Sequence, residues 1–327
     1  MTVSHSAWAL LLLVTLTLLA SPAAADYRGQ AIDFTDSGTV SGDVIVTTGD
    51  SRYSGEVTPG GTYSVTFPVS VPTGASHIPN ASVYLSWTWS HSGTSGRTPS
   101  LKTEIGGTSL EPARQYTDHK GSPPYDYPSG LNVYDVSGTV RAGTPLTLTV
   151  TNTATDAGIA FNGAALVLTY EDGTDGVSYW IAEGADMIYA TEGISADEAS
   201  VRIVYPDLPS VPAGGLATLL AVVPGGNKGK NTLTVNGREF AGLFNGKPYA
   251  DFAVNSTEVG PLLVPGSNTI TLRDEGDYMV PGVFVLVIRK SDGSSPGATT
   301  QGAPVDSSIA IGALVVAACV ALGARRR

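Results

Sequence analysis

Cysteine is almost absent from this chain of 327 residues, which contains only Cys319. Because Cys319 lies in an apolar segment near the end, the rest of the chain can form no disulfide bond. It also offers no thiol nucleophile and no cysteine ligand for zinc. The fold must therefore be stabilised by a packed core alone, which the length of the chain allows.

Basic residues are also scarce, since 18 Lys and Arg stand against 29 Asp and Glu and the formal net charge is -11. A protein that binds nucleic acid needs a basic face, so no nucleic-acid partner is expected.

Histidine is rare, and the region between the two apolar ends has only His77, His91 and His119, far apart in the sequence. This region has no Gly-x-Ser-x-Gly elbow, no His-Glu-x-x-His pair and no phosphate-binding loop. The sequence therefore predicts a protein that is not an enzyme. A glycosidase remains an alternative, because the pairing of its two carboxylates is set by the fold and not by a local motif.

Long windows of helical periodicity are missing between the two ends, whereas several runs alternate with the strand period of two. Residues 146–150 alternate Leu and Val with Thr, and residues 164–170 are nearly all apolar, as in a central strand buried on both faces. Trp87 and Trp89 share one face of another run, which predicts that both belong to the core. The chain also contains 39 glycines and 21 prolines. Together with the alternating runs, they predict an all-β protein with many tight turns.

The sequence also repeats itself in order, with the spacing between matched positions falling steadily toward the end. The matched pairs are Val71-Pro72-Thr73-Gly74 with Val211-Pro212-Ala213-Gly214, Ile105-Gly106-Gly107 with Val235-Asn236-Gly237, Ala142-Gly143 with Pro265-Gly266, and residues 165–168 with 285–288. The largest loss of length maps to residues 115–128, an apparent insertion in the first copy. We therefore predict two tandem antiparallel β-sandwich domains, jelly-roll or Ig-like, over residues 26–175 and 176–291.

Both ends of the chain are apolar. Residues 1–25 resemble a secretory signal with cleavage between Ala25 and Asp26. Residues 292–306 form a Ser/Gly/Thr/Pro spacer, and residues 307–324 predict a short transmembrane helix. Arg325, Arg326 and Arg327 then place the end of the chain in the cytoplasm and the two domains outside the cell.

An ordered set of short motifs resembles a family of exported proteins that is common in methanogenic archaea and is catalogued only as a domain of unknown function. The motifs are Ser41-Gly42-Asp43, Val83-Tyr84-Leu85-Ser86-Trp87, Tyr134-Asp135-Val136, Tyr170-Glu171-Asp172, and Tyr179-Trp180 with Glu183-Gly184-Ala185-Asp186. The tail is similar to archaeal sorting tails but lacks their Pro-Gly-Phe triplet. The resemblance implies an archaeal envelope protein and implies no activity.

Three kinds of candidate site remain. Asn80 and Asn255 begin glycosylation sequons. Tyr116, Tyr125 and Tyr127 lie near or in a Pro-rich loop and could stack on sugar rings, although tyrosine beside proline is also ordinary loop packing. No cofactor is expected. Calcium is the minority alternative at two acidic turns, Glu171, Asp172 and Asp175, and Asp274, Glu275 and Asp277.

These observations predict a non-enzymatic protein of the cell surface, structural or adhesive, that is tethered to the membrane by its C-terminal helix. Its expected partners are other envelope proteins or glycans. The alternative is an anchored glycan-binding module or glycosidase.

Overall fold

Strands make up nearly all of the regular structure. The computed structural model describes residues 27–75, 77–174 and 176–290. Within these ranges the helical structure is limited to one 3-10 turn, η1 (Gly260–Leu262), and every strand pairing within the sheets is antiparallel. The all-β fold that the sequence predicts is confirmed.

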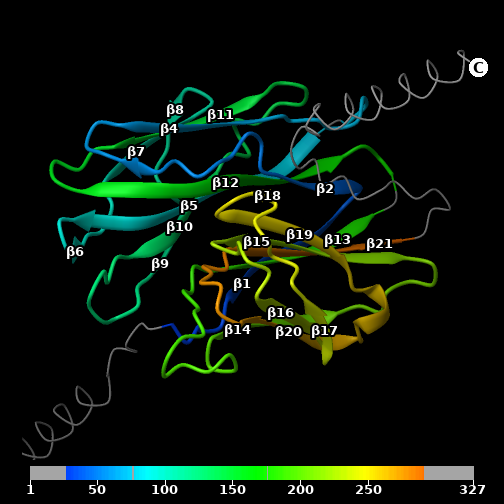
Figure 1. The fold of residues 1–327 in the computed structure, drawn as a ribbon. Helices are drawn as coiled ribbons and strands as arrows, with labels where there is room; N and C mark the ends of the chain where they lie inside the picture. Colours follow the sequence, from blue (N-terminus) through cyan, green and yellow to red (C-terminus); the bar gives the residue numbers. More distant parts are fainter. Residues whose placement is uncertain (1–26, 76, 175, 291–327) are drawn as a thin grey trace, which may run out of the picture.

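The first sandwich comprises an outer and an inner sheet (Figure 1). The first outer sheet has the order β4 (Thr62–Phe67), β11 (Leu146–Asn152), β7 (Leu101–Ile105), β8 (Thr108–Ser109). The first inner sheet has the order β2 (Gly42–Thr47), β12 (Gly158–Glu171), β5 (His77–Ser92), β10 (Ser129–Asp135), β9 (Arg114–Asp118), with β3 (Glu56–Val57) beside β12 and β6 (Ser95–Gly96) beside β5. One apolar core, which includes Phe67, Leu85 and Phe161, fills the space between them.

The second sandwich is built in the same way. The second inner sheet has the order β1 (Asp33–Val40), β13 (Val177–Glu183), β21 (Val283–Arg289), β15 (Leu216–Pro224), β19 (Phe252–Glu258), β18 (Pro248–Tyr249). The second outer sheet has the order β14 (Ser200–Leu208), β20 (Gly266–Asp274), β16 (Asn231–Val235), β17 (Arg238–Ala241). Strand β1 precedes position 175 in the sequence yet pairs with β13 along its length.

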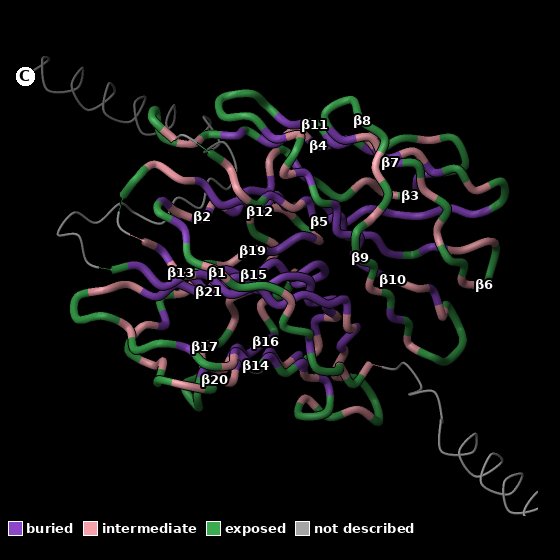
Figure 2. Tube along the Cα trace, turned by 180° about the vertical axis from the view of Figure 1, so that it is seen from behind, coloured by how far each residue is buried: buried purple, intermediate pink, exposed green. Residues whose placement is uncertain are grey.

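The two inner sheets pack face to face, so the molecule has four layers of sheet (Figure 1). We call this interface the seam. Its apolar residues include Tyr84 and Val133 from the first inner sheet and Leu220 and Val285 from the second. The inner strands are therefore buried on both faces, as Figure 2 shows, and this explains the nearly unbroken apolar run of β12.

Two ion pairs cross the seam at opposite ends of the β13–β21 ladder. Arg289, the last residue of β21, donates to both carboxylate oxygens of Asp43 at 2.7 to 3.0 Å. Glu183, the last residue of β13, accepts two hydrogen bonds of 2.8 Å from Arg114 of β9. The carboxylate of Glu183 is 1% exposed, whereas the Arg114 side chain is 42% exposed, so the pair joins a buried carboxylate to a guanidinium at the surface.

The two sandwiches share one topology. The sheet order β4-β11-β7-β8 corresponds to β14-β20-β16-β17, and β2-β12-β5-β10-β9 corresponds to β13-β21-β15-β19-β18. The repeat positions found in the sequence fall at equivalent places. For example, Gly106 and Gly237 both lie in the turn between paired outer strands, β7 with β8 and β16 with β17.

Several predicted segments lie outside the described residues. These are the signal segment with Ala25 and Asp26, Asp175, the spacer, the predicted helix 307–324, and Arg325, Arg326 and Arg327. Within the part of the chain that the structure describes, no helix is both long and apolar enough to cross a membrane.

Candidate functional site

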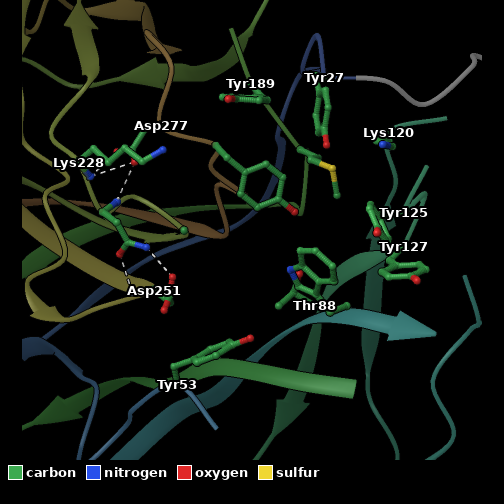
Figure 3. Close-up of a pocket in the computed structure, with 15 residues that line it drawn as sticks. Tyr27, Tyr53, Thr88, Lys120, Tyr125, Tyr127, Tyr189, Lys228, Asp251 and Asp277 are labelled. Carbon is green, nitrogen blue, oxygen red and sulfur yellow. Dashed lines mark hydrogen bonds between the residues drawn. The ribbon is translucent and has the colours of Figure 1, made fainter. Parts of the chain in front are cut away.

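A cavity of about 510 Å³ lies between the two sandwiches, near the end of the molecule where β5 and β13 finish and β21 begins (Figure 3). Both sandwiches line it. Its residues are Tyr27, Tyr53, Thr88, Trp89, Lys120, Tyr125, Tyr127, Met187, Tyr189, Gly225, Asn227, Lys228, Asp251, Asp277 and Tyr278. Seven of them are aromatic, and a lining rich in aromatic side chains with a few polar groups is typical of small-molecule sites.

One wall is formed by Trp89, Tyr125 and Tyr127, which we call the loop aromatic group. Trp89 and Tyr127 pack edge to face with ring centroids 5.4 Å apart, and Tyr125 lies 5.8 Å from Tyr127. Tyr127 also stacks on His91 at 4.4 Å and donates its hydroxyl to the carbonyl of Gly93. These contacts fix the wall in one arrangement, while Tyr125 remains 60% exposed.

The prediction that Trp89 belongs to the core is wrong, whereas Trp87 is buried as predicted, with 2% exposed. Strand β5 has a bulge here, because Gly158 pairs with His91 but Ala160 already pairs with Thr88. Trp89 has a φ of 54° and is 44% exposed. The bulge breaks the alternation of the strand and turns the indole toward the cavity.

A second wall is formed by Tyr27, Tyr189 and Tyr278, which we call the tyrosine triad. Their rings pack edge to face, with centroid distances of 5.4 Å, 6.0 Å and 6.2 Å. Burial raises the pKa of Tyr27 to about 12, so its hydroxyl stays protonated at neutral pH and can donate a hydrogen bond. In Figure 3, Tyr27 and Tyr189 lie on one side of the cavity, and Tyr125 and Tyr127 on another.

Unusual backbone conformations concentrate at this cavity. Six described residues other than glycine have positive φ, and four of them line the cavity, namely Trp89, Tyr125, Asp251 and Tyr278. A bulky residue in this region costs about 1–3 kcal/mol, and such strain gathers at functional sites. The backbone conformation of three of the aromatic residues, and of Asp251, is therefore a second sign that the cavity has a function.

The remaining wall is polar and is organised around Asn227. The carboxylate of Asp277 accepts hydrogen bonds from the backbone N–H groups of Asn227 and Lys228, at 3.2 Å and 2.9 Å. The Asn227 side chain bridges to Asp251, donating Nδ2 to its carboxylate and accepting from its backbone N–H. Burial raises the pKa of Asp277, and these hydrogen bonds and the charge of Lys228 oppose that rise.

The loop of residues 119–128, between β9 and β10, carries Tyr125 and Tyr127 and forms most of the predicted insertion of residues 115–128, whose first four residues belong to β9. It is fastened to itself, because Asp126 accepts from the His119 ring at 3.0 Å and from the backbone of Gly121 at 2.8 Å. Asp118, at its base, accepts from the backbone N–H of Met187 at 2.8 Å, which ties the loop to the second sandwich.

Asp186 lies beside this tie. Burial and the nearby charge of Asp118 raise the pKa of Asp186 to about 7, with a smaller contribution from Asp33, while a hydrogen bond from the Gln30 backbone opposes the rise. Its Oδ2 is buried and has no hydrogen-bond partner in the described structure. The base of the loop therefore holds a carboxyl group that changes charge near neutral pH.

Tyr116, the third tyrosine predicted for ligand binding, does not line the cavity. Its hydroxyl donates to the carboxylate of Glu183 at 3.1 Å. The same carboxylate accepts from Arg114 and, at 2.7 Å, from the hydroxyl of Tyr84. The structure thus brings Tyr125 and Tyr127 together at the cavity and places Tyr116 at the seam.

The other predicted sites are the two sequons and the two acidic turns, one of which includes the cavity residue Asp277. Asn80 is exposed on β5, and its amide donates to the hydroxyl of Tyr179 at 3.1 Å, while Asn255 is half-buried on β19. Asp274 accepts from the backbone N–H groups of Ala190, Gly276 and Asp277.

Within the described ranges, no group of three or more His, Cys, Asp or Glu is arranged to hold a metal ion. Glu275 pairs with Arg273 at 3.0 Å, and Asp172 accepts from Thr174. The described carboxylates of the two turns thus bond groups of the chain itself, and Asp175 lies outside the described residues.

Sequence reasoning missed much of the cavity. Tyr27, Tyr189 and Tyr278 lie far apart in the sequence, and no local pattern connects them. The one available signal was the insertion itself, because a repeat that is longer in one copy marks the loop that differs in function.

Comparisons with known proteins add a family. The chain belongs to the family described as a protein of unknown function, DUF3344, whose family model matches residues 26–289. The resemblance found in the sequence, to a family of unknown function, is confirmed to that extent. A comparison with curated proteins found no match.

Similar solved structures include dimeric latent PorU from Porphyromonas gingivalis, at 11% identity and a TM-score of 0.26, covering 85% of this chain and 22% of that one. An α-L-rhamnosidase of Streptomyces avermitilis has 17% identity and a TM-score of 0.22, with 84% and 29% covered. A β-porphyranase from Bacteroides plebeius has 10% identity and a TM-score of 0.22, with 81% and 37% covered. This chain spans well under half the length of each.

Proposed function

We propose that this protein is a non-enzymatic surface protein that binds glycans in the cavity between its two sandwiches. One observation carries the proposal: seven aromatic side chains from both sandwiches line a single cavity of about 510 Å³. Cavities of roughly 300–1,000 Å³ are typical of small-molecule sites, and this one is large enough for one to a few sugar rings.

The chemistry of the walls fits a sugar. A pyranose ring has an apolar face of C–H groups that packs on an aromatic ring, and hydroxyl groups at its rim that need hydrogen-bond partners. The loop aromatic group supplies the ring surface. Tyrosine hydroxyls and the polar groups around Asn227 supply partners close to that surface.

The position of the cavity suits a protein that reaches outward. Tyr278 lines the cavity just before β21, and β21 ends at Arg289 on the far side of the fold, about 20 Å away at a strand rise of roughly 3.3 Å per residue. In Figure 1, β21 leads away from the β9–β10 loop. A tether that followed Lys290 would hold the cavity away from the membrane.

The same proposal includes export and anchoring. It rests on the signal-like residues 1–25, the apolar residues 307–324 and the three final arginines. Amino-terminal sequencing of the protein from cells should begin at Asp26, and a start at Met1 would contradict cleavage. Deletion of residues 307–327 should release folded protein into the medium.

A glycan array tests the binding. The full chain should bind a subset of glycans saturably, and Tyr125→Ala with Tyr127→Ala should abolish that binding. Phe34→Ala is the matched control, because Phe34 is also an exposed aromatic residue, at 38%, but lies on β1 and does not line the cavity. Binding that survives the tyrosine double substitution, or that Phe34→Ala removes equally, would contradict the proposal.

A glycosidase is the second candidate, because Asp251 and Asp277 both line the cavity and burial raises the pKa of Asp277. Such an enzyme needs one carboxyl group as an acid and a second as a base or nucleophile. Against this role, both carboxylates accept hydrogen bonds from the Asn227 turn. Release of reducing ends from a bound glycan, lost in Asp277→Asn, would favour the enzyme over the binding protein.

A further inference from the structure

Two lysines line the cavity, one from each sandwich. Lys120 belongs to the loop of residues 119–128 and is half-buried, and Lys228 belongs to the turn between β15 and β16 and is exposed. Figure 3 shows them approaching the cavity from opposite sides, with Lys120 near Tyr125. A ligand between the two aromatic walls would therefore have an ammonium group on either side.

Neither lysine has a carboxylate partner in the described part of the chain. The ammonium of Lys120 donates to the backbone carbonyl of Pro124, a neutral group. Some other cations of the described fold do form ion pairs, such as Lys102 with Glu104 at 2.7 Å and Arg289 with Asp43 at 2.7 Å. Among the described lysines, Lys230 and Lys247 also form no ion pair but do not line the cavity, so Lys120 and Lys228 are the two unpaired ammonium groups that a ligand there would meet.

The acidic residues of the cavity form no direct ion pair with either lysine in the described structure, although the charge of Lys228 opposes the rise that burial causes in the pKa of Asp277. Asp277 uses its carboxylate to hold the backbone of Lys228 and Asn227, and Asp251 is bonded to the Asn227 side chain. These contacts fix the turn that carries Lys228 while its ammonium stays available. The turn is therefore ready to present a positive charge to a bound molecule.

We propose that the glycan bound in the cavity is acidic, that Lys120 and Lys228 bind carboxylates of hexuronate units on opposite sides of the cavity, and that one of these rings packs on the loop aromatic group. This inference rests on the proposed function, because it specifies which sugar the same cavity takes. A neutral hexose would leave both ammonium groups without an ionic partner. A quaternary ammonium ligand, which aromatic rings could also bind, would be repelled by both lysines.

Binding of uronates and of their methyl esters tests the inference, because the ester keeps the ring and removes only the charge. The probes are trisaccharides of galacturonate, glucuronate and mannuronate, each paired with its ester, titrated calorimetrically into the full chain in detergent. At least one acid should bind more tightly than its ester, by about tenfold at low salt. The preference should shrink as salt is raised, since salt screens exposed charges.

Lysine substitutions then locate the effect. Lys120→Gln and Lys228→Gln should each weaken binding of the uronate by about three- to tenfold and leave binding of its methyl ester nearly unchanged. Lys230→Gln is the matched control, because Lys230 is exposed close to Lys228 in the sequence but does not line the cavity. Trp89→Ala should weaken acid and ester alike, which would separate the contribution of the ring from that of the charge.

The outcomes separate the two proposals. An ester that binds as tightly as its acid, or a sulfated hexose or choline bound in preference, would overturn the assignment to a carboxylate and leave sugar binding in place. Equal losses for acid and ester in the lysine variants would also overturn it. If no acid or ester binds and no glycan on the array binds either, the proposed function itself fails.

Discussion

The two sandwiches have the same strand order but differ at the end that forms the cavity. In the first, strands β9 and β10 are joined by residues 119–128, whereas in the second the equivalent β18 and β19 are joined by Ala250 and Asp251 alone. The long loop carries two tyrosines and a lysine of the cavity, and the short turn contributes Asp251. The shared part of the repeat is thus the scaffold, and the part that differs carries the candidate site.

The comparison also shows why the two copies stay together. Each sandwich could bury its own core, but the inner sheets also bury each other across the seam. The cavity needs this arrangement, because its two aromatic walls come from different sandwiches. We therefore expect the two copies to unfold as one cooperative unit rather than in sequence.

Removing Glu183 should have the largest effect on that unit. Glu183→Ala leaves the hydroxyls of Tyr84 and Tyr116 without their acceptor and removes the bidentate partner of the exposed Arg114. The free energy of unfolding should therefore fall by about 3–5 kcal/mol in all, at about 1–3 kcal/mol for each lost group. Urea unfolding measures it. Glu104→Ala is the control, because its pair with Lys102 is exposed and should contribute about 1 kcal/mol or less. Equal losses for the two variants would mean that the seam does not depend on this pair.

The pH dependence of stability should be governed by Asp186. Folding raises its pKa from 3.8 to about 7, so the folded protein holds the proton more tightly than the unfolded chain. The tighter binding of this proton stabilises the folded protein by up to about 4 kcal/mol. The stabilisation is complete below about pH 4 and is lost as the pH rises through 7. Asp186→Asn should remove this fall in stability with rising pH. Thermal unfolding of both proteins at pH 5 and pH 8 measures the difference. An unchanged pH profile in the variant would contradict this.

Shortening the long loop tests the comparison most directly. Replacing residues 119–128 by an Ala-Asp pair, as in the second sandwich, should weaken glycan binding by about a hundredfold, or about 3 kcal/mol, since the ring contacts of two tyrosines and the charge of Lys120 are lost. The unfolding midpoint should change little. Binding that persists in a folded variant would assign recognition to the tyrosine triad instead.

The closeness of the seam can be tested at Gly163. A Cβ at this position would lie 2.7 Å from the Phe252 ring of the other inner sheet, so Gly163→Ala should cost about 1–3 kcal/mol of stability. Gly138→Ala is the control, because a Cβ there meets no atom within 4 Å. A stability loss no greater than that of the control would show that the two sandwiches can move apart.

The sequence predicts part of the layered fold. Alternation and turn residues predicted the strands, and the ordered repeat marked equivalent turns of both copies. The seam was not predicted, although the apolar run of residues 164–170 showed that one strand is buried on both faces. A run of apolar residues records burial but does not say which sheet supplies the cover.

The site was readable only where its residues are local. Tyr125 and Tyr127 lie in a Pro-rich loop, which favours exposed function, and both line the cavity. Trp89 was assigned to the core because alternation was assumed to continue, whereas a bulge reverses it. Tyr27 and Tyr278 meet only because β1 and β21 both flank β13, a long-range pairing that no local pattern records.

The place of Tyr27 has a practical consequence for the laboratory. This tyrosine begins the described chain and is also part of the cavity wall, where its ring meets Tyr189 and Tyr278. A purification tag or fluorophore fused just before it would hang beside the cavity mouth and could compete with a sugar for the rings. Labels for an array or a pull-down are therefore better attached after Lys290, and a negative result with an amino-terminal tag should be repeated without one.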